Sequence, residues 1–248
     1  MSTKHVTPYA SSNSKNQQVR EMFNRISNRY DSLNSILSLG VHRYWRKACL
    51  NEIKKKTTQP KFILDVATGT GDFALTCLNL NPEKITGMDI SAGMLNIGQT
   101  KLKLRNIPST KIELIEDNAE TCTRFENTFD LAVVAFGVRN FENLDKGLCN
   151  IKRMLKPNGV ICVLEFTYPR NKLIKLIYHF YFKRIIPWIG RFFSSDSKAY
   201  RYLFESVQEF PHFDSFIKHL HDAGYNQTSF RSLSFGIACC YTGIKKAS

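Results

Sequence analysis

The chain reads Leu64-Asp65-Val66-Ala67-Thr68-Gly69-Thr70-Gly71-Asp72 at the start of its most regular region. The apolar run that ends at Val66 predicts a buried strand, and the two glycines predict a tight turn that leads into a helix. In such a unit the glycines let the backbone approach a ligand closely, and the helix N-terminus offers unpaired N–H groups. The stretch therefore predicts a nucleotide or nucleoside site.

Short apolar strands and helical segments alternate after this turn. We expect strands at residues 62–66, 85–88, 112–115, 129–136 and 160–166, and helices at 72–79, 91–104 and 144–155. This alternation predicts a parallel sheet covered by helices on both faces. Residues 228–235 and 237–243 predict a closing antiparallel pair. The expected fold is α/β and Rossmann-like, with seven mostly parallel strands and an antiparallel last strand.

Two carboxylates indicate which nucleotide the site takes. Asp89 lies 18 residues after Gly71, at the end of the second strand, where a carboxylate accepts hydrogen bonds from both ribose hydroxyls. The spacing Gly69-x-Gly71-x-x-Ala74 also fits the dinucleotide fingerprint, so a nicotinamide cofactor stays open on spacing alone. Asp65 favours S-adenosylmethionine (SAM), because a carboxylate there can meet a cationic amino group but would repel a pyrophosphate.

The segment after the third strand is polar. It reads Glu116-Asp117-Asn118-Ala119-Glu120. The Asn118 amide can read the adenine edge, and Ala119 can supply a backbone N–H. We therefore expect the adenine of the cofactor to bind here, although a plain loop has the same composition.

Basic side chains gather in two segments. The formal net charge is +14, from 35 Lys and Arg against 21 Asp and Glu. Residues 1–60 hold 11 basic and 3 acidic side chains, residues 166–195 hold six basic and no acidic ones, and the rest is nearly balanced. Two local patches predict docking on one anionic surface, either phosphate backbone or lipid headgroups.

The seven cysteines are odd in number and include no C-x-x-C pair. This pattern argues against a disulfide framework and against a zinc site, so we expect no metal and a reducing compartment. The N-terminus has no apolar signal core, and no stretch reaches the ~18 apolar residues of a membrane span. The sequence predicts a protein that is soluble or bound at a membrane surface.

The domain organisation follows from these patterns. Residues 1–17 are polar and predict a flexible tail, and residues 18–60 predict an N-terminal helical cap. Residues 61–248 form the expected cofactor-binding domain, with a helical insert at about 170–210 that mixes aromatic, aliphatic and basic side chains. Such an insert can lie in the headgroup plane of a membrane or simply cover a pocket.

A set of further motifs extends beyond the glycine turn. They are residues 23–45 (F-N-R-I-S-N-R-Y-D-S-L-N-S-I-L-S-L-G-V-H-R-Y-W), Phe136-Gly137-Val138-Arg139-Asn140, Leu155-Lys156-Pro157-x-Gly159, Leu164-Glu165-Phe166 and Tyr200-Arg201-Tyr202-Leu203-x-Glu205-Ser206. On these motifs, the chain resembles the ubiquinone/menaquinone biosynthesis C-methyltransferases from about residue 19 to residue 243. Thr68, where many relatives carry glycine, and the Asp117 and Thr121-Cys122 positions depart from the family pattern.

The resemblance implies a class I SAM-dependent methyltransferase fold and SAM as the methyl donor. By position in the family motifs, Thr70, Asp89, Asn118 and Ala119 would contact SAM, beside Asp65, Gly69 and Gly71 of the turn. It implies methylation of a ring carbon of a reduced, polyprenylated demethylquinone. We expect demethylmenaquinol as the substrate, with the benzoquinol precursor of ubiquinone, or both quinols, as the alternative.

Ring methylation needs a group that favours a phenolate, because a ring carbon is a poor nucleophile until a neighbouring hydroxyl loses its proton. Arg139 follows the fourth strand and is the first candidate, for electrostatic stabilisation rather than as a base, since guanidinium stays protonated. Asn140 could orient the same group. An alternative for Arg139 is a structural ion pair with an acidic residue on an adjoining helix. Candidate substrate residues are Tyr30, Asp31, His42, Tyr168, Tyr200 and Tyr202.

The substrate's lipid tail predicts where the protein works. We expect a cytoplasmic protein bound peripherally to the inner face of the membrane through its basic segments, with no nucleic-acid partner. The sequence leaves the oligomeric state open, with a homo-oligomer as one option. Both basic segments should then share one face at the pocket mouth. An RNA methyltransferase is a remote alternative, but no N/D-P-P-Y/F motif or RNA-binding module occurs. The sequence leaves two more protein classes open, a nicotinamide oxidoreductase and a non-enzymatic lipid- or quinone-binding protein.

Overall fold

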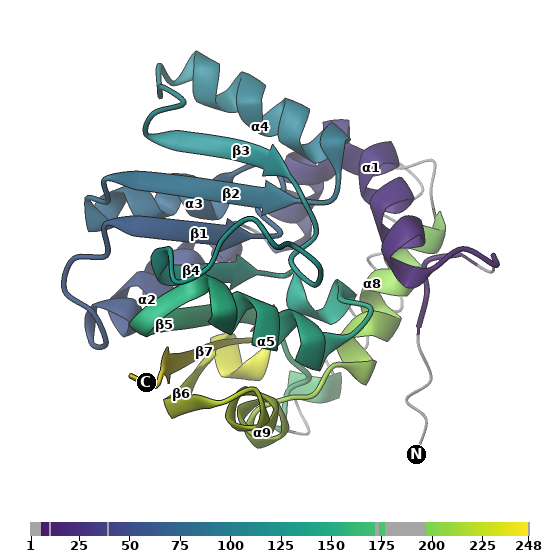
Figure 1. Cartoon of the computed structure of the whole chain (residues 1–248). Coiled ribbons are helices and arrows are strands. Elements are labelled where there is room, and N and C mark those ends of the chain that lie inside the picture. The colour runs from purple at the N-terminus through teal and green to yellow at the C-terminus, as the bar shows by residue number, and fades with distance from the viewer. Residues whose placement is uncertain (1–5, 10, 39, 172–173, 177–196, 248) are drawn as a thin grey trace.

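The computed structural model describes residues 6–9, 11–38, 40–171, 174–176 and 197–247 (Figure 1). Its centre is a seven-stranded sheet in the order β3-β2-β1-β4-β5-β7-β6. The first five strands are parallel, and β7 runs antiparallel to both β5 and β6. The expected α/β fold with an antiparallel last strand is therefore confirmed.

The strands begin and end close to the predicted positions. Their bounds are β1 Phe62–Val66, β2 Lys84–Asp89, β3 Ile112–Glu116, β4 Phe129–Ala135, β5 Leu155–Phe166, β6 Tyr225–Leu233 and β7 Ala238–Lys245. The largest difference is in β5, which includes the expected Lys156–Gly159 turn. That turn loops out of the sheet, because the pairing with β4 jumps from Phe129–Leu155 to Leu131–Val160. β6 begins three residues before the predicted strand because Tyr225 and Asn226 already pair with β7.

Helices cover both faces of the sheet. Their bounds are α1 Lys15–Leu37, α2 Val41–Lys54, α3 Asp72–Cys77, α4 Ala92–Leu104, α5 Leu144–Met154, α8 Ser197–Glu209 and α9 Asp214–Asp222, with short 3-10 turns at Leu78–Leu80, Val138–Asn140 and Ser234–Gly236. α5 and α9 pack on one face, which includes Leu64 and Val66. α2, α3 and α4 pack on the other face, which includes Ile63 and Leu131. Neighbouring residues of a strand thus enter opposite cores, as a doubly covered parallel sheet requires.

α1 lies beyond the ends toward which the parallel strands point, next to α8 (Figure 1). Its Val19 and Met22 form a small apolar cluster with Ala199 and Tyr202 of α8. α1 also packs against α4, so closely that a Cβ on Gly93 would lie 3.0 Å from the Asn24 side chain. The N-terminal helix therefore stands at the edge of the sheet where α/β proteins bind ligands.

The N-terminal prediction differs in its boundary. α1 begins at Lys15, inside the expected tail, and Tyr9 already donates its backbone N–H to the Gln18 side chain at 2.9 Å. In the described parts of the chain, no helix is long and apolar enough to cross a membrane. Most of the basic segment 166–195 lies outside the described residues.

Candidate cofactor site and active site

A cavity opens where β1 and β2 end, and residues of α1 form one of its walls. A smaller cavity adjoins it and shares Tyr30, Ala67 and Gly69 as lining residues. Of the predicted site residues, the larger cavity is lined by Tyr30, Gly69, Asp89, Asn118, Ala119 and Asn140, and the smaller one by Tyr30, Asp65, Gly69 and Thr70. The structure therefore brings together side chains that are up to 110 residues apart in the chain.

Asp65 is a fully buried carboxylate with one oxygen unpaired. Its Oδ2 accepts hydrogen bonds from the Thr68 hydroxyl at 2.6 Å and the Ala74 backbone N–H at 2.9 Å, while Oδ1 has no partner. Burial raises the pKa of Asp65 to about 7. Such a carboxylate is costly without a donor or a cation beside it. A positively charged ligand group next to Oδ1 would satisfy it.

Thr68 explains one departure from the family pattern. Its hydroxyl donates to Asp65, so the residue that replaces glycine adds a donor to the buried carboxylate. The turn itself needs its glycines, because Gly69 and Gly71 adopt φ values of 58° and 80°. These left-handed conformations are strained for residues with a Cβ.

Asp89 ends β2 and fastens the glycine turn. Its Oδ2 accepts from the Gly69 N–H at 2.8 Å, and its Oδ1 accepts from the Ser91 N–H at 2.9 Å. Burial raises its pKa to about 6, against these backbone hydrogen bonds. Each oxygen keeps lone-pair capacity toward the cavity. The carboxylate can therefore accept from two adjacent hydroxyls, as predicted for a ribose.

Thr70 is held by neighbouring charged residues. Its hydroxyl donates to Asp31 of α1 at 2.6 Å and accepts from Lys101 of α4 at 2.9 Å. Lys101 also pairs with Asp31 and with Asp72, each at 2.7 Å. Asp31 thus fastens α1 to the glycine turn and to α4. It does not line either cavity.

The expected adenine segment lines the larger cavity. The side-chain oxygen of Asn118 accepts from the Glu120 N–H at 2.9 Å, and the Asp117 carboxylate accepts from the Asn118 N–H at 2.8 Å. Ala119 is buried. The Asn118 oxygen shapes its own loop, so its amide NH₂ group is the part that can act as a donor toward a ligand.

Arg139 forms a buried ion pair. Its guanidinium lies 2.7 Å from Glu165 of β5, and the two side chains are only 6% and 0% exposed. Arg139 also donates to the Phe136 carbonyl at 2.5 Å and stacks over the Phe166 ring. Burial raises the pKa of Glu165, and the Arg139 charge opposes that shift. Arg139 therefore has the structural ion pair that was the alternative to its catalytic role, although with a strand rather than a helix.

Asn140 is the member of this group that reaches the larger cavity. Its side-chain oxygen accepts from the Tyr202 hydroxyl at 3.1 Å, and its NH₂ group donates to the Phe136 carbonyl at 3.3 Å. Lys15 donates to the carbonyls of Arg139 and Phe141 from the other side. Burial lowers the pKa of Lys15 to about 8. The turn after β4 is therefore fixed by side chains from α1 and α8.

Two further predicted substrate residues, His42 and Tyr168, line neither of the two cavities. His42 is buried and shares a hydrogen bond with Ser38, and burial lowers its pKa to about 4, so it is neutral at pH 7. Tyr168 lies under the Lys175 ammonium group, 4.8 Å from the ring centre. The side chain of Tyr200 lies outside the described residues.

Three residues of this region have no role in the sequence interpretation. Glu165 carried a signal, because it is the one acidic residue in the apolar run of residues 160–166. Lys101 gave none, since a lysine in the last turn of a helix is ordinary. Lys15 fell in the segment predicted as a tail.

The donors and acceptors of this site suit SAM. Asp65 offers an unpaired oxygen to an ammonium group, Asp89 offers a carboxylate to two hydroxyls, and the apolar side chains of Phe23 and Met94 line the same cavity as Asp89. No phosphate-binding cation is needed for such a ligand, and Arg46 beside Asp65 is already paired with Asp72 at 2.9 Å.

Solved structures with this fold include a [4+2]-cyclase, SpnF, with a TM-score of 0.63 and 15% identity over 95% of this chain and 97% of that one. A SAM-dependent methyltransferase from Thermotoga maritima, a possible histamine N-methyltransferase, has a TM-score of 0.62 and 16% identity, covering 92% of this chain and 99% of that one. At these identities the likeness shows the fold alone, which is that of class I SAM-dependent methyltransferases.

The sequence comparisons are more specific. A demethylmenaquinone methyltransferase from Bacteroides fragilis is 42% identical over 97% of both chains. A ubiquinone/menaquinone biosynthesis C-methyltransferase, UbiE, from Geotalea daltonii is 40% identical over 93% of this chain and 97% of its own. The model of the ubiE/COQ5 methyltransferase family matches residues 11–245. The chain therefore belongs to the ubiE/COQ5 methyltransferase family.

Proposed function

We propose that the protein transfers the methyl group of SAM to a ring carbon of a reduced polyprenyl demethylquinone, converting demethylmenaquinol to menaquinol. Family membership supports the reaction class, and the 42% identity to the Bacteroides fragilis demethylmenaquinone methyltransferase over nearly the full chain supports the substrate. The benzoquinol precursor of ubiquinone is the second candidate, because the Geotalea daltonii relative is named for both pathways.

One observation carries the cofactor assignment. Asp65, whose buried Oδ1 has no partner, lines one of two adjoining cavities, and Asp89 lines the other. SAM has a cationic amino group at one end and a ribose diol near its centre, so the two carboxylates can serve both parts of the molecule. Asn118 and Ala119 then receive the adenine. SAM supplies an electrophilic methyl group on its sulfonium.

The protein's own part in the reaction is alignment of the reacting groups. Sulfur, methyl and ring carbon must lie in line, and holding them so accounts for much of the catalysis in such displacements. Arg139 pairs with Glu165 and lines neither cavity, so its part is to hold the turn after β4, from which Asn140 orients a ring oxygen at the cavity wall. Tyr202 fixes Asn140 through its hydrogen bond.

The placement of α1 supports a lid over the cofactor. Asn24 accepts hydrogen bonds from Ser91 at 2.7 Å and Gly93 at 3.0 Å, and Asp31 pairs with Lys101, so α1 is tied to α4 at two levels. Opening these contacts would expose the cavity. Residues 18–60 then act as a cap on the methyltransferase domain at residues 61–248.

A lipid-borne substrate supports a site of action at a membrane surface. We propose peripheral binding to the cytoplasmic face through the basic segments of residues 1–60 and 166–195, since the prenyl tail stays in the bilayer while the ring enters the site. Arg170 and Lys175 are the described cations of the second segment. The proposal includes self-association of the chain into a homo-oligomer.

The test is an assay of the purified protein with isotopically labelled SAM. Detergent-dispersed demethylmenaquinol, the benzoquinol precursor and bulk tRNA are offered separately, and the products are identified by mass spectrometry. We expect label on the naphthoquinol ring at a rate well above that for the benzoquinol. Label on the benzoquinol alone would favour the second candidate, and label on tRNA alone would overturn the proposal.

A further inference from the structure

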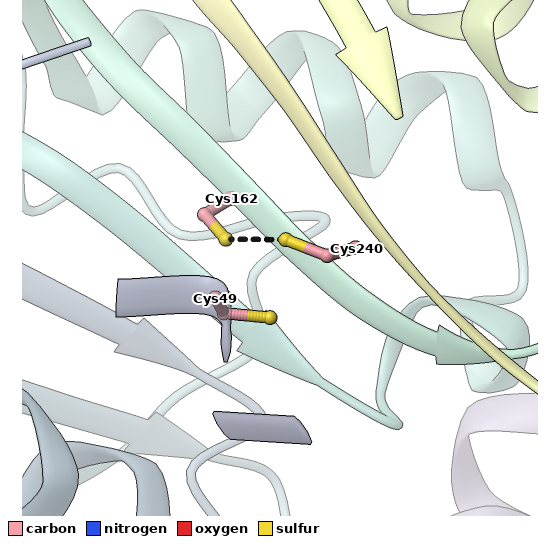
Figure 2. Close-up of side chains that lie close together, drawn as sticks. All are labelled: Cys49, Cys162 and Cys240. Carbon is pink, nitrogen blue, oxygen red and sulfur yellow. Dashed lines mark hydrogen bonds between the residues drawn. The ribbon is translucent and has the colours of Figure 1, made fainter. Parts of the chain in front are cut away.

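Three cysteines that are distant in the sequence converge in the core (Figure 2). Cys49 comes from α2, Cys162 from β5 and Cys240 from β7, and their sulfur atoms all lie within 4.8 Å of one another. The Sγ atoms of Cys162 and Cys240 are 3.6 Å apart. We call these residues the thiol trio. All three are at most 1% exposed.

A disulfide between Cys162 and Cys240 is disfavoured by the strand register. Cys162 stands opposite Thr242, and Cys240 stands opposite Leu164, so the two cysteines are diagonal rather than facing neighbours. Diagonal pairs in an antiparallel sheet are roughly 7–8 Å apart, beyond the reach of an unstrained disulfide. The two sulfurs lie close together although they come from diagonal positions, which disfavour a direct bond between them.

The spacing suits one ion held by three sulfurs. Three sulfurs bonded to one ion at about 2.3 Å lie at most about 4.0 Å apart, the value for a planar arrangement, and lie closer when a lone pair places the ion outside the plane of the sulfurs. The Cys162 and Cys240 sulfurs, 3.6 Å apart, are already within this limit, and the 4.8 Å limit of the trio means that Cys49 needs to move by about 1 Å at most to reach it. Among the described residues, the trio offers no fourth His, Cys, Asp or Glu ligand. Burial also keeps water from the fourth position that zinc would need.

The charge of the occupant follows from the surroundings. The trio lies within the apolar core that α2 and α3 form with the sheet. A net charge there is costly, so three thiolates need three positive charges. Copper(I) or zinc(II) with three thiolates leaves negative charge behind. A trivalent ion that binds only three ligands balances the three thiolates and leaves no net charge.

We propose that Cys49, Cys162 and Cys240 form a three-thiol site for a trivalent group 15 ion, arsenic(III) or antimony(III). Arsenous acid, As(OH)₃, is neutral and reacts with three thiols to give As(SR)₃ and three waters. Three As–O and three S–H bonds break, three As–S and three O–H bonds form, and no atom changes oxidation state. Reactants and products are all uncharged, so arsenic binding adds no net charge to the apolar core. Entry requires a transient opening of α2 from the sheet.

The experiment titrates the reduced full-length protein with arsenite, removes free arsenic by gel filtration and counts arsenic per chain. We expect one arsenic per wild-type chain and a sulfur-to-arsenic absorption in the near ultraviolet. Cys49→Ala should weaken binding at least 100-fold, and Cys162→Ala and Cys240→Ala should do the same. Cys77→Ala is the matched control, because Cys77 is also helical, fully buried and part of the same core.

SAM binding by each variant serves as the folding check. If Cys162→Ala and Cys240→Ala do not fold, the comparison of arsenic binding by Cys49→Ala and by Cys77→Ala tests the proposal alone. The proposal is overturned if wild-type protein retains no arsenic, if Cys77→Ala loses it equally, or if X-ray absorption finds only two sulfur neighbours. Displacement of the arsenic by copper(I) would overturn the charge argument.

Discussion

Asp65 and Glu165 are both buried carboxylates near the same edge of the sheet, but they differ in what neutralises them. Glu165 has the Arg139 guanidinium at 2.7 Å. Asp65 has only a hydroxyl and a backbone N–H, and its Oδ1 has no partner. The chain itself therefore neutralises the carboxylate at the end of β5, whereas the carboxylate at the end of β1 can still accept a hydrogen bond from a ligand. This difference separates a structural ion pair from a binding site.

The largest expected effect is on the stability of the folded protein, when the buried Arg139–Glu165 ion pair is broken. Glu165→Ala leaves the Arg139 charge buried and unpaired, which costs about 3–5 kcal/mol of unfolding free energy. Urea unfolding monitored by circular dichroism measures this. Glu113→Ala is the control, because Glu113 and Lys84 form a surface ion pair, which contributes only about 0–1 kcal/mol to stability. Equal losses in the two variants would mean that Arg139 does not depend on Glu165.

The next largest effect is on SAM affinity, when the carboxylate that accepts from the ribose hydroxyls is removed. Asp89→Ala should raise the SAM dissociation constant roughly 10- to 150-fold, because a hydrogen bond to a charged acceptor contributes about 1.5–3 kcal/mol. Isothermal titration calorimetry measures the change. Glu116→Ala, at the end of the neighbouring strand β3, should bind SAM within about twofold of wild type, since an exposed ion pair contributes little. Wild-type affinity in Asp89→Ala would refute the ribose contact.

The pH dependence tests Asp65 itself. Its pKa in the folded protein is raised from 3.8 to about 7, so the unfolded chain loses this proton first. Stability without ligand should therefore fall as pH rises from about 4 to about 7. A cationic ligand favours the ionised carboxylate, so SAM affinity should rise about tenfold between about pH 5.5 and 7.5.

Asp65→Asn should flatten both profiles, because the amide does not titrate. Calorimetry in buffers of different ionisation enthalpy counts the proton that wild-type protein releases on SAM binding. A variant that keeps the wild-type slope would assign the titration to another group, with Asp89 as the first to examine, since burial raises its pKa to about 6.

The smallest effect concerns the contacts of α1. Lys101→Met removes the cation between Asp31 and Asp72, and should speed SAM dissociation about threefold, the scale of a partly exposed ion pair. Stopped-flow fluorescence measures the rate. Lys103→Met on the same helix is the control and should leave it unchanged. An unchanged rate in Lys101→Met would mean that α1 does not hold the cofactor in place.

Local sequence patterns were enough to single out Asp65 and Asp89, which the structure places at the two adjoining cavities. Asp65 and Asp89 each sit at a strand end next to a glycine turn or helix start, so their positions follow from one stretch of chain. Glu165 and Arg139 are 26 residues apart and meet only because β4 and β5 are neighbours in the sheet. The same holds for the contact of Asp31 with Lys101, which depends on where α1 lies.

The thiol trio is the clearest case of what sequence spacing misses. Its members are spread from residue 49 to residue 240, in no metal-binding motif, and sheet register alone brings two of them together. Both basic segments were visible in the sequence. Their common face is a prediction that rests mostly on residues 177–196, outside the described part of the chain.

A crystal structure of the protein with bound S-adenosylhomocysteine or SAM would decide whether Asp65 and Asp89 together hold the cofactor. We expect the ligand's ammonium group within hydrogen-bond distance of Asp65 Oδ1, and both ribose hydroxyls on Asp89. A ligand bound with its methionyl end elsewhere, leaving Asp65 Oδ1 still unpaired, would contradict the assignment.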